Sequence, residues 1–168
     1  MARVVLVTGG NLGDMRPRLQ TAQKLINDRI GAVMRCSHRY TSDAWGFDSA
    51  DEFTNQVLVV DTDLAPEAVL FEVQKIEREL GRDRRAEQAA KEASGARYCS
   101  RVIDIDILFY DNLVIDTPDL VIPHPLMQER DFVLRPLYEL MKEFRHPVLG
   151  KTIGELRAEL AEAEGRTR

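Results

Sequence analysis

The sequence has little cysteine, no long apolar run and no pattern typical of a signal peptide. Its two cysteines, Cys36 and Cys99, lie far apart and without metal-type spacing, so we expect neither a disulfide framework nor a zinc site. No run of about 18 apolar residues occurs, which argues against a transmembrane helix. The opening MARVVLVTGG lacks the length and cleavage pattern of a signal peptide. These absences predict a cytoplasmic protein without a membrane partner.

Basic residues are outnumbered by acidic ones. Lysine and arginine total 23 against 28 acidic residues, a formal net charge of -5. Such a surface does not attract polyanions as a whole, so we expect no nucleic-acid partner. Hydrophobic residues make up 44% of the 168 residues, enough to build the core of one domain spanning 1–168. No surplus apolar helix face is evident, and we therefore expect a monomer.

Apolar periodicity and turn residues outline the fold. They predict strands at 4–7, 32–40, 53–61 and 101–110, a hairpin strand at 113–115, and helices at about 14–30, 66–80, 131–142 and 152–164. We expect Asp14 to cap the first helix, and Gly31 and Gly81 to end the first and second. Residues 41–52 and 82–100 are predicted loops, the second a long mobile flap.

This order of elements indicates an α+β protein. Strand, helix, strand, strand, helix, strand is the βαββαβ pattern of ferredoxin-like folds. It implies a mainly antiparallel sheet with helices packed on it, followed by a C-terminal hairpin and helices. Because this architecture hosts many activities, the function must be argued from particular side chains.

Two acidic residues interrupt the most apolar predicted strand. Side chains alternate between the faces of a strand, so Asp104 and Asp106 share one face, roughly 6.5 to 7 Å apart. The other face carries the apolar residues Ile103, Ile105, Ile107 and Phe109. Like charges repel unless something positive lies between them, and oxygen ligands favour magnesium. The alternative is a half-solvated strand with two exposed acids.

A basic segment leads into this strand. Between Arg78 and Arg101 there are seven basic and four acidic side chains. The basic ones are Arg78, Arg82, Arg84, Arg85, Lys91, Arg97 and Arg101. Arginine binds phosphate in a bidentate manner, so a cationic flap over a dicarboxylate metal site suits a polyphosphate. A solvated charged loop is the alternative.

A histidine between two prolines follows further on. Pro123 and Pro125 stiffen the backbone around His124, and Arg130 and Phe132 come shortly after. A histidine, an arginine and an aromatic ring together suit a phosphate and a stacked planar ligand. The alternative is a turn that caps a helix, with Phe132 in the core.

In this order the motifs resemble one family, the 6-hydroxymethyl-7,8-dihydropterin pyrophosphokinases, over nearly the whole chain. The motifs are Gly9-Gly10-Asn11-Leu12-Gly13-Asp14, Trp45-Gly46-Phe47, Phe53-Thr54-Asn55, Gln74-Lys75-Ile76-Glu77, Gly81-Arg82-Asp83-Arg84, Arg101 to Asp106, Pro123-His124-Pro125 and Arg130-Asp131-Phe132. The resemblance implies transfer of pyrophosphate from ATP to the hydroxymethyl group of the pterin, with release of AMP, in folate biosynthesis.

The resemblance also implies roles for residues. Asp104 and Asp106 match carboxylates that hold two Mg²⁺ ions, and with Arg82 and Arg101 they form the implied catalytic set. The residues implied for ATP are Gln74, Glu77, Arg82, Arg84, Arg101, His124 and Arg130. Those implied for the pterin are Ser42, Trp45, Phe53, Asn55 and Phe132.

Three other readings of the sequence stay open. One is a different two-metal nucleotidyl or phosphoryl transferase, which would also need Asp104 and Asp106. Another is a non-enzymatic ferredoxin-like module that binds RNA through exposed aromatic residues. The third is a member of the same family that is fused to, or docks on, a neighbouring folate enzyme.

Overall fold

The computed structural model describes residues 1–42, 53–83, 85, 88–89, 92–93 and 102–166. The elements lie in the order β1 (Ala2–Gly10), α1 (Met15–Arg29), β2 (Gly31–Cys36), β3 (Tyr40–Ser42), β4 (Phe53–Thr62), α2 (Pro66–Glu79), β5 (Asp104–Tyr110), β6 (Ile115–Asp116), β7 (Val121–Ile122), the 3₁₀ turn η1 (Met127–Glu129), α4 (Asp131–Met141) and α5 (Ile153–Arg166).

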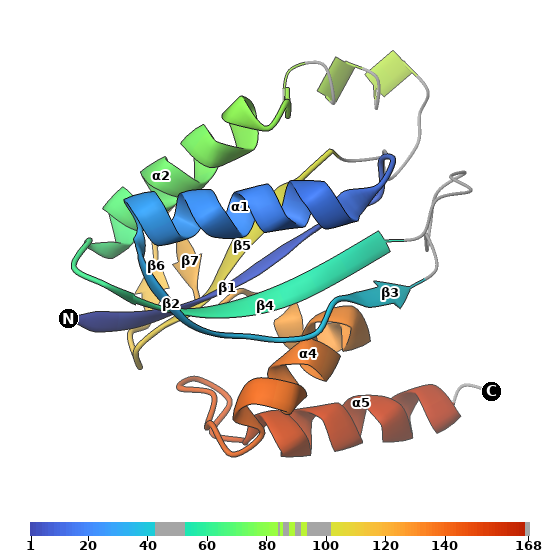
Figure 1. The fold of residues 1–168 in the computed structure, drawn as a ribbon. Coiled ribbons are helices and arrows are strands. Elements are labelled where there is room, and N and C mark those ends of the chain that lie inside the picture. The colour runs from blue at the N-terminus through green and yellow to red at the C-terminus, as the bar shows by residue number, and fades with distance from the viewer. Residues whose placement is uncertain (43–52, 84, 86–87, 90–91, 94–101, 167–168) are drawn as a thin grey trace.

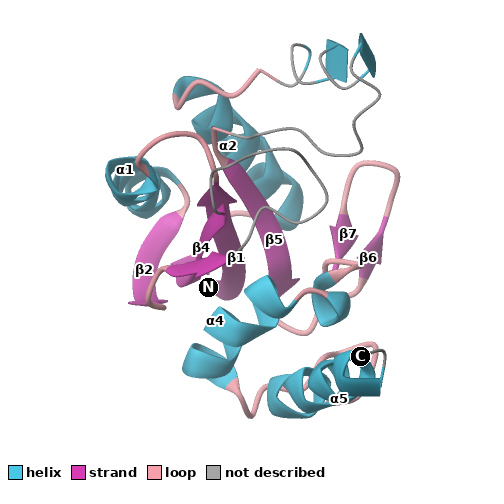
Figure 2. Ribbon diagram, turned by 90° about the vertical axis from the view of Figure 1, so that its right-hand side faces the viewer, coloured by secondary structure: helices cyan, strands magenta, loops and turns pink. Residues whose placement is uncertain are grey.

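One antiparallel sheet organises the chain. Its strand order is β2-β4-β1-β5, and the short β3 pairs with β4. This is the order that a βαββαβ unit gives when each helix crosses back over the sheet, so the predicted α+β, ferredoxin-like architecture is confirmed. β6 and β7 form a separate two-stranded hairpin beside β5 (Figure 2).

Helices cover both faces of the sheet. α1 and α2 lie on one face, and α4 and α5 lie on the other (Figure 1). Successive side chains of β1 supply both cores: Val4 and Leu6 pack toward α1 and α2, while Val5 and Val7 pack toward α4 and α5. A strand buried on both faces accounts for the unbroken apolar run at 4–7.

The predicted ends of the first two helices are partly confirmed. Asp14 caps α1, its carboxylate accepting from the Arg16 backbone N–H at 3.1 Å. Gly81 follows α2 with φ +102°, the left-handed geometry expected of a helix-ending glycine. Gly31 has a different role, since it begins β2 and a Cβ there would overlap the Asp61 carbonyl oxygen of β4. It permits close strand approach.

The predicted strand at 32–40 is wrong as a single element. β2 ends at Cys36, and β3 resumes the pairing with β4 at Tyr40. Between them the Ser37 hydroxyl accepts from the Val57 backbone N–H at 3.0 Å. A side chain here takes over a backbone hydrogen bond of the ladder, which apolar periodicity cannot reveal.

The strand predicted at 101–110 begins later than expected, and one of its residues faces the opposite side of the sheet from the predicted one. β5 begins at Asp104, and its register with β1 shifts between Ile107 and Phe109. This bulge at Leu108 turns Phe109 to the α4 face, away from the predicted isoleucine face.

Residues 113–114 do not pair with β5, so the hairpin predicted across Asp111-Asn112 is wrong. The observed hairpin joins β6 to β7.

The predicted flap is in part helical. Residues 85, 88–89 and 92–93 have helical geometry, contrary to the predicted loop. Gln88 donates to Glu92, one helical turn on, at 2.9 Å, and the Asp83 carboxylate accepts from the Arg85 backbone N–H. The segment has no apolar period, but its Ala, Glu, Gln and Lys residues have high intrinsic helix propensity. Residues 84, 86–87, 90–91 and 94–100 of the predicted flap lie outside the described residues.

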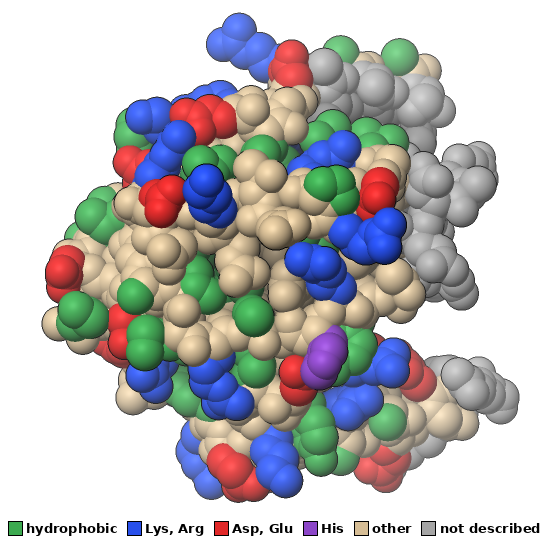
Figure 3. Space-filling view, in the orientation of Figure 1, with side chains coloured by type: hydrophobic (Ala, Val, Ile, Leu, Met, Phe, Trp, Pro, Cys, Tyr) green, Lys and Arg blue, Asp and Glu red, His purple; other side chains and the backbone are tan. Residues whose placement is uncertain are grey.

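The surface is mixed in charge. Acidic and basic side chains lie side by side over the helices in the view of Figure 3. None of the helices in the described part of the chain has the length and apolar character needed to cross a membrane.

Candidate active site

The candidate site lies where β1 ends and where β4 and β5 begin. Gly9 of β1 is paired with Asn55 of β4 on one side and with Asp104 of β5 on the other. Residues paired across a sheet share a face, and neighbouring strands lie about 4.8 Å apart. The sheet thus brings a residue implied for the pterin and one implied for the metal into a single row.

Asp104 and Asp106 share the face of the sheet that α4 covers. Asp106 is paired with Val7, which belongs to the α4 core, whereas Ile105 packs in the α1–α2 core. The two carboxylates are partly open to solvent, with side-chain exposures of 24% and 33%. The predicted separation of faces is therefore confirmed for this part of the strand.

Arg82 contacts the first residue of the acidic pair, Asp104. Its Nη1 atom donates to Asp104 Oδ1 at 2.9 Å and to Glu77 Oε2 at 2.7 Å, and its side chain is only 4% exposed. The buried guanidinium of Arg82 compensates the negative charge of the Asp104 and Glu77 carboxylates. The structure therefore brings Arg82, Glu77 and Asp104 together in one buried ionic cluster.

His124 reaches the same place from the segment after β7. Its backbone N–H donates to the Leu108 carbonyl at 3.1 Å, and its Nε2 atom lies 3.8 Å from Asp106 Oδ2. Burial and, next, the charge of Arg130 lower the pKa of His124, while Asp104 opposes the shift. The ring is thus neutral at pH 7, and Nδ1 accepts the Leu126 backbone N–H, so Nε2 carries the proton.

Asn55 has an unsatisfied donor. The residue is 6% exposed, and its Nδ2 atom is buried without a hydrogen-bond partner in the part of the chain that the structure describes. Buried amides rarely remain unpaired, which marks this atom as a candidate ligand contact. Two residues earlier, Phe53 lies half-buried at the start of β4.

Arg130 and Phe132 lie at the start of α4. The Arg130 guanidinium carbon is 5.7 Å from the centre of the Phe132 ring. Phe132 is 38% exposed, so it is not a core residue. A cation and an aromatic face presented together to solvent can meet a phosphate and a planar ring.

The other predicted site residues are placed less fully. Gln74 is half-buried on α2, one turn before Glu77. Ser42 ends β3, where its backbone pairs with Phe53. Trp45, Arg84 and Arg101 lie outside the described residues.

Arg18 is a neighbour of the site that no sequence pattern singled out. From α1, its Nη1 atom donates to the carbonyls of Leu12, at 2.5 Å, and Val102, at 3.0 Å. It thereby ties the turn after β1 to the segment that leads into Asp104. No local pattern marks an arginine that bonds to two distant backbone carbonyls.

Comparison with known proteins decides the family. The family model for 7,8-dihydro-6-hydroxymethylpterin-pyrophosphokinase (HPPK) matches residues 5–142. The chain belongs to the HPPK family. A Porphyromonas gingivalis 2-amino-4-hydroxy-6-hydroxymethyldihydropteridine pyrophosphokinase is 38% identical over 83% of this chain and 91% of its own. A namesake from Aquifex aeolicus is 35% identical, with 95% and 92% covered.

A solved structure agrees on the fold. Plasmodium falciparum HPPK-DHPS with pteroate superposes with a TM-score of 0.76 at 17% identity, covering 96% of this chain. The chain spans 42% of the length of that protein.

The family fixes the activity. The chain is an ATP-dependent pyrophosphokinase of folate biosynthesis. The predicted function is confirmed at this level, and the readings as another phosphoryl transferase or as an RNA-binding module are ruled out.

Proposed function

We propose that Asp104 and Asp106 hold two Mg²⁺ ions for the phosphates of ATP, and that Phe53, Asn55 and Phe132 bind the pterin. The observation that carries the proposal is the pairing of Gly9 with both Asn55 and Asp104. It places the unpaired Asn55 Nδ2 donor on one side of β1 and the Asp104 carboxylate on the other. A planar substrate bound at Asn55 would hold its hydroxymethyl arm toward phosphates bound at Asp104.

The acidic pair fits magnesium. Mg²⁺ is typically held by one or two carboxylates together with substrate phosphates and water. Asp104 and Asp106 supply two carboxylates on one face, both partly open to solvent. When bound, Mg²⁺ would neutralise negative charge on the phosphate oxygens as the transfer proceeds.

Cationic and neutral donors around the pair suit the remaining phosphate oxygens. We propose that Arg130 and the Nε2–H of His124 face the phosphates, and that Arg84 and Arg101 also bind them. His124 is suited to donate without adding charge because its pKa is lowered by burial. Gln74, half-buried on the adjacent helix, is proposed to contact the nucleotide.

The pterin slot is proposed to lie between two rings. Phe53 on β4 and Phe132 on α4 would stack on its faces, while Asn55 Nδ2 donates to an acceptor on its edge. Ser42, at the end of β3, and Trp45 are proposed to line the same slot. An amide that is buried and unpaired without substrate gains a partner only when the pterin binds, which favours the correct ligand.

Positioning is the main task of the site. The hydroxymethyl oxygen attacks the β-phosphorus of ATP. The bond from the β-phosphorus to the oxygen of the α-phosphate breaks, AMP leaves, and the hydroxyl proton is released. Such phosphoryl chemistry depends chiefly on alignment and charge neutralisation.

We propose that the chain works as a cytoplasmic monomer of one domain.

Product analysis of variants tests the assignment. Purified protein with ATP, Mg²⁺ and 6-hydroxymethyl-7,8-dihydropterin should form AMP only when the pterin is present. Asp104→Asn and Asp106→Asn should each lower this rate by about 100-fold or more. Asp116→Asn, on the exposed β6–β7 hairpin, is the control and should keep the wild-type rate. Full activity in either site variant would refute the metal assignment.

A further inference from the structure

Glu77 is an ionisable side chain in the protein interior. It lies in the last turn of α2, yet its side chain is only 1% exposed. Its Oε2 atom accepts from Arg82 Nη1 at 2.7 Å and from the Ile105 backbone N–H at 2.8 Å. A carboxylate at this depth is tolerated only with such charged and hydrogen-bonding partners.

The local sequence explains how Arg82 reaches Glu77. Gly81 takes a left-handed conformation, φ +102°, and the Arg82 backbone N–H then donates to the Glu77 carbonyl at 3.0 Å. This is the hydrogen bond of a Schellman turn, which folds the chain back on the helix end. Arg82 therefore bonds to Glu77 through both its backbone and its side chain.

The second hydrogen-bond partner of Glu77, the Ile105 backbone N–H, lies between the candidate metal ligands Asp104 and Asp106. β5 is an edge strand of the sheet, and the Ile105 N–H donates to Glu77 and not to β1. Glu77 pairs this edge donor and so fixes the strand at the residue between Asp104 and Asp106. Arg82, held by the same carboxylate oxygen, donates in turn to Asp104.

We propose that Glu77 is a positioning residue for the metal site and not a nucleotide contact. It holds the backbone between the two aspartates and anchors the guanidinium that balances Asp104. The inference rests on the proposed metal role of that pair. Without the Glu77 charge, one anion beside Arg82 is lost, so Arg82 binds Asp104 more tightly and Asp104 is less available to Mg²⁺.

Calorimetric titration with Mg²⁺ in the presence of α,β-methylene-ATP tests the proposal. Glu77→Gln keeps the size of the side chain but removes its charge. The apparent Mg²⁺ affinity should fall by about 10-fold or more, as for other residues that support metal ligands. The Mg²⁺ needed for half-maximal AMP formation should rise in step, while KM for the pterin stays unchanged.

Glu79→Gln is the matched control. Glu79 lies two residues further along, at the surface, and pairs with Arg29 at 2.6 Å. It should bind Mg²⁺ as the wild type does. If Glu77→Gln does not fold, Glu77→Asp carries the test, because it keeps the charge but shortens the reach. Wild-type Mg²⁺ affinity in the folded variant would overturn the proposal.

A parallel titration of Asp104→Asn separates the two failures. If Asp104→Asn binds Mg²⁺ like the wild type, the metal site itself is wrong. If Asp104→Asn loses Mg²⁺ while Glu77→Gln behaves like Glu79→Gln, only the role of Glu77 is refuted.

Discussion

Gly9 packs directly against Asn55. A Cβ added at Gly9 would overlap the Asn55 Oδ1 atom and lie 2.8 Å from the Thr54 carbonyl oxygen. Since Gly9 is also paired with Asp104, this glycine lies between the proposed pterin residue Asn55 and the proposed metal residue Asp104, which are on the two strands that flank β1. A side chain there would separate them.

Gly9→Ala should therefore weaken pterin binding. The methyl group must displace Asn55, so we expect KM for the pterin to rise by about 10-fold and stability to fall by about 1–3 kcal/mol, as for other overpacked sites. Gly165→Ala, with open space around the added Cβ, is the control and should be neutral or slightly stabilising. Steady-state kinetics and urea denaturation measure both effects, and an unchanged pterin KM would contradict the proposed slot.

Phe132→Ala should lower pterin affinity with little loss of stability. The ring is 38% exposed, so truncation leaves no deep cavity, but it removes one proposed stacking partner worth about 1 kcal/mol or more. Phe71→Ala, at an exposed aromatic on α2, should change neither quantity. Fluorescence titration with the pterin would show the difference, and equal affinities in the two variants would exclude Phe132 from the slot.

Acid should destabilise the fold through His146. Burial lowers its pKa below the ordinary value of 6.5, and its Nδ1 atom accepts the backbone N–H groups of Val148 and Leu149. Below about pH 6.5 the unfolded chain binds a proton that the folded chain refuses, so stability falls as the pH falls and is recovered above that pH.

Replacing His146 should reduce this acid sensitivity. His146→Asn keeps an acceptor but does not titrate, so its melting temperature should fall less between pH 7 and pH 5 than that of the wild type. His38→Asn, at a ring that is 85% exposed, provides the control. A wild-type acid dependence in His146→Asn would assign the effect to other groups.

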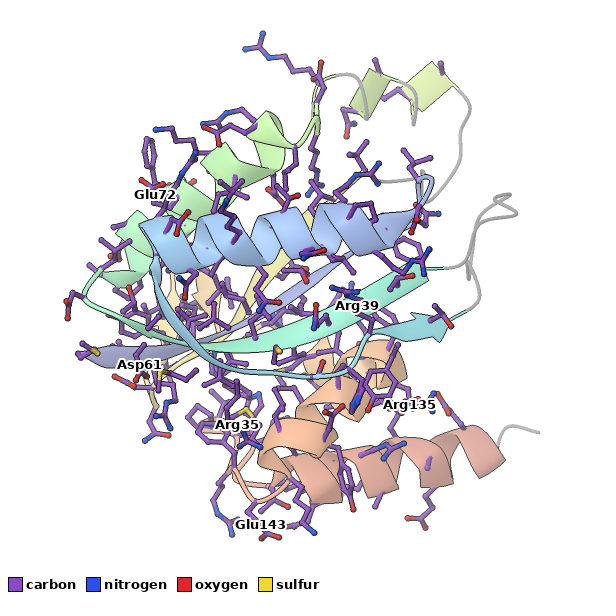
Figure 4. All side chains as sticks on the ribbon, in the orientation of Figure 1. Arg35, Arg39, Asp61, Glu72, Arg135 and Glu143 are labelled. Carbon is purple, nitrogen blue, oxygen red and sulfur yellow. The ribbon has the colours of Figure 1, made fainter. Side chains whose placement is uncertain are left out.

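Polar side chains of α4 should stabilise the position of β3. The Glu139 carboxylate accepts from the Tyr40 hydroxyl at 2.6 Å and from the His38 backbone N–H at 3.1 Å. Arg135 lies over the Tyr40 ring at 4.9 Å, and Figure 4 shows it beside β3. Because β3 pairs with Phe53 and Asn55, this cluster supports one wall of the proposed slot.

Tyr40→Phe isolates the hydroxyl of this cluster. We expect a stability loss of at most about 1 kcal/mol, since the cluster faces solvent, and a modest rise in KM for the pterin with unchanged KM for ATP. Glu155→Gln on α5 serves as a surface control. Equal effects on both KM values would show that β3 does not act on the pterin side alone.

The sequence predicted the fold where a pattern is local. Val4 to Val7 marked a doubly buried strand, Asp14 a helix cap and Gly81 a helix end, and all three follow from neighbouring residues alone. The bulge at Leu108 and the break at Ser37 depend on what the partner strand offers. Strand period therefore could not reveal them.

The sequence predicted which types of residue form the site, but less well how deeply each side chain is buried. The alternation around Ile105 predicted that Asp104 and Asp106 share a face, and the structure agrees. The resemblance implied Glu77 beside ATP; the structure shows its side chain buried and bonded to Arg82 and to the Ile105 N–H, because the Gly81 turn and the edge of β5 converge on it. Such three-way convergence is a tertiary property that no spacing in the sequence records.

Counting bound ions tests the central claim most directly. Electron paramagnetic resonance of Mn²⁺, titrated with the protein and α,β-methylene-ATP, should count two ions per chain in the wild type. Asp104→Asn and Asp106→Asn should each lose at least one ion while keeping the wild-type melting temperature. Two ions retained in either variant would contradict the proposed metal site.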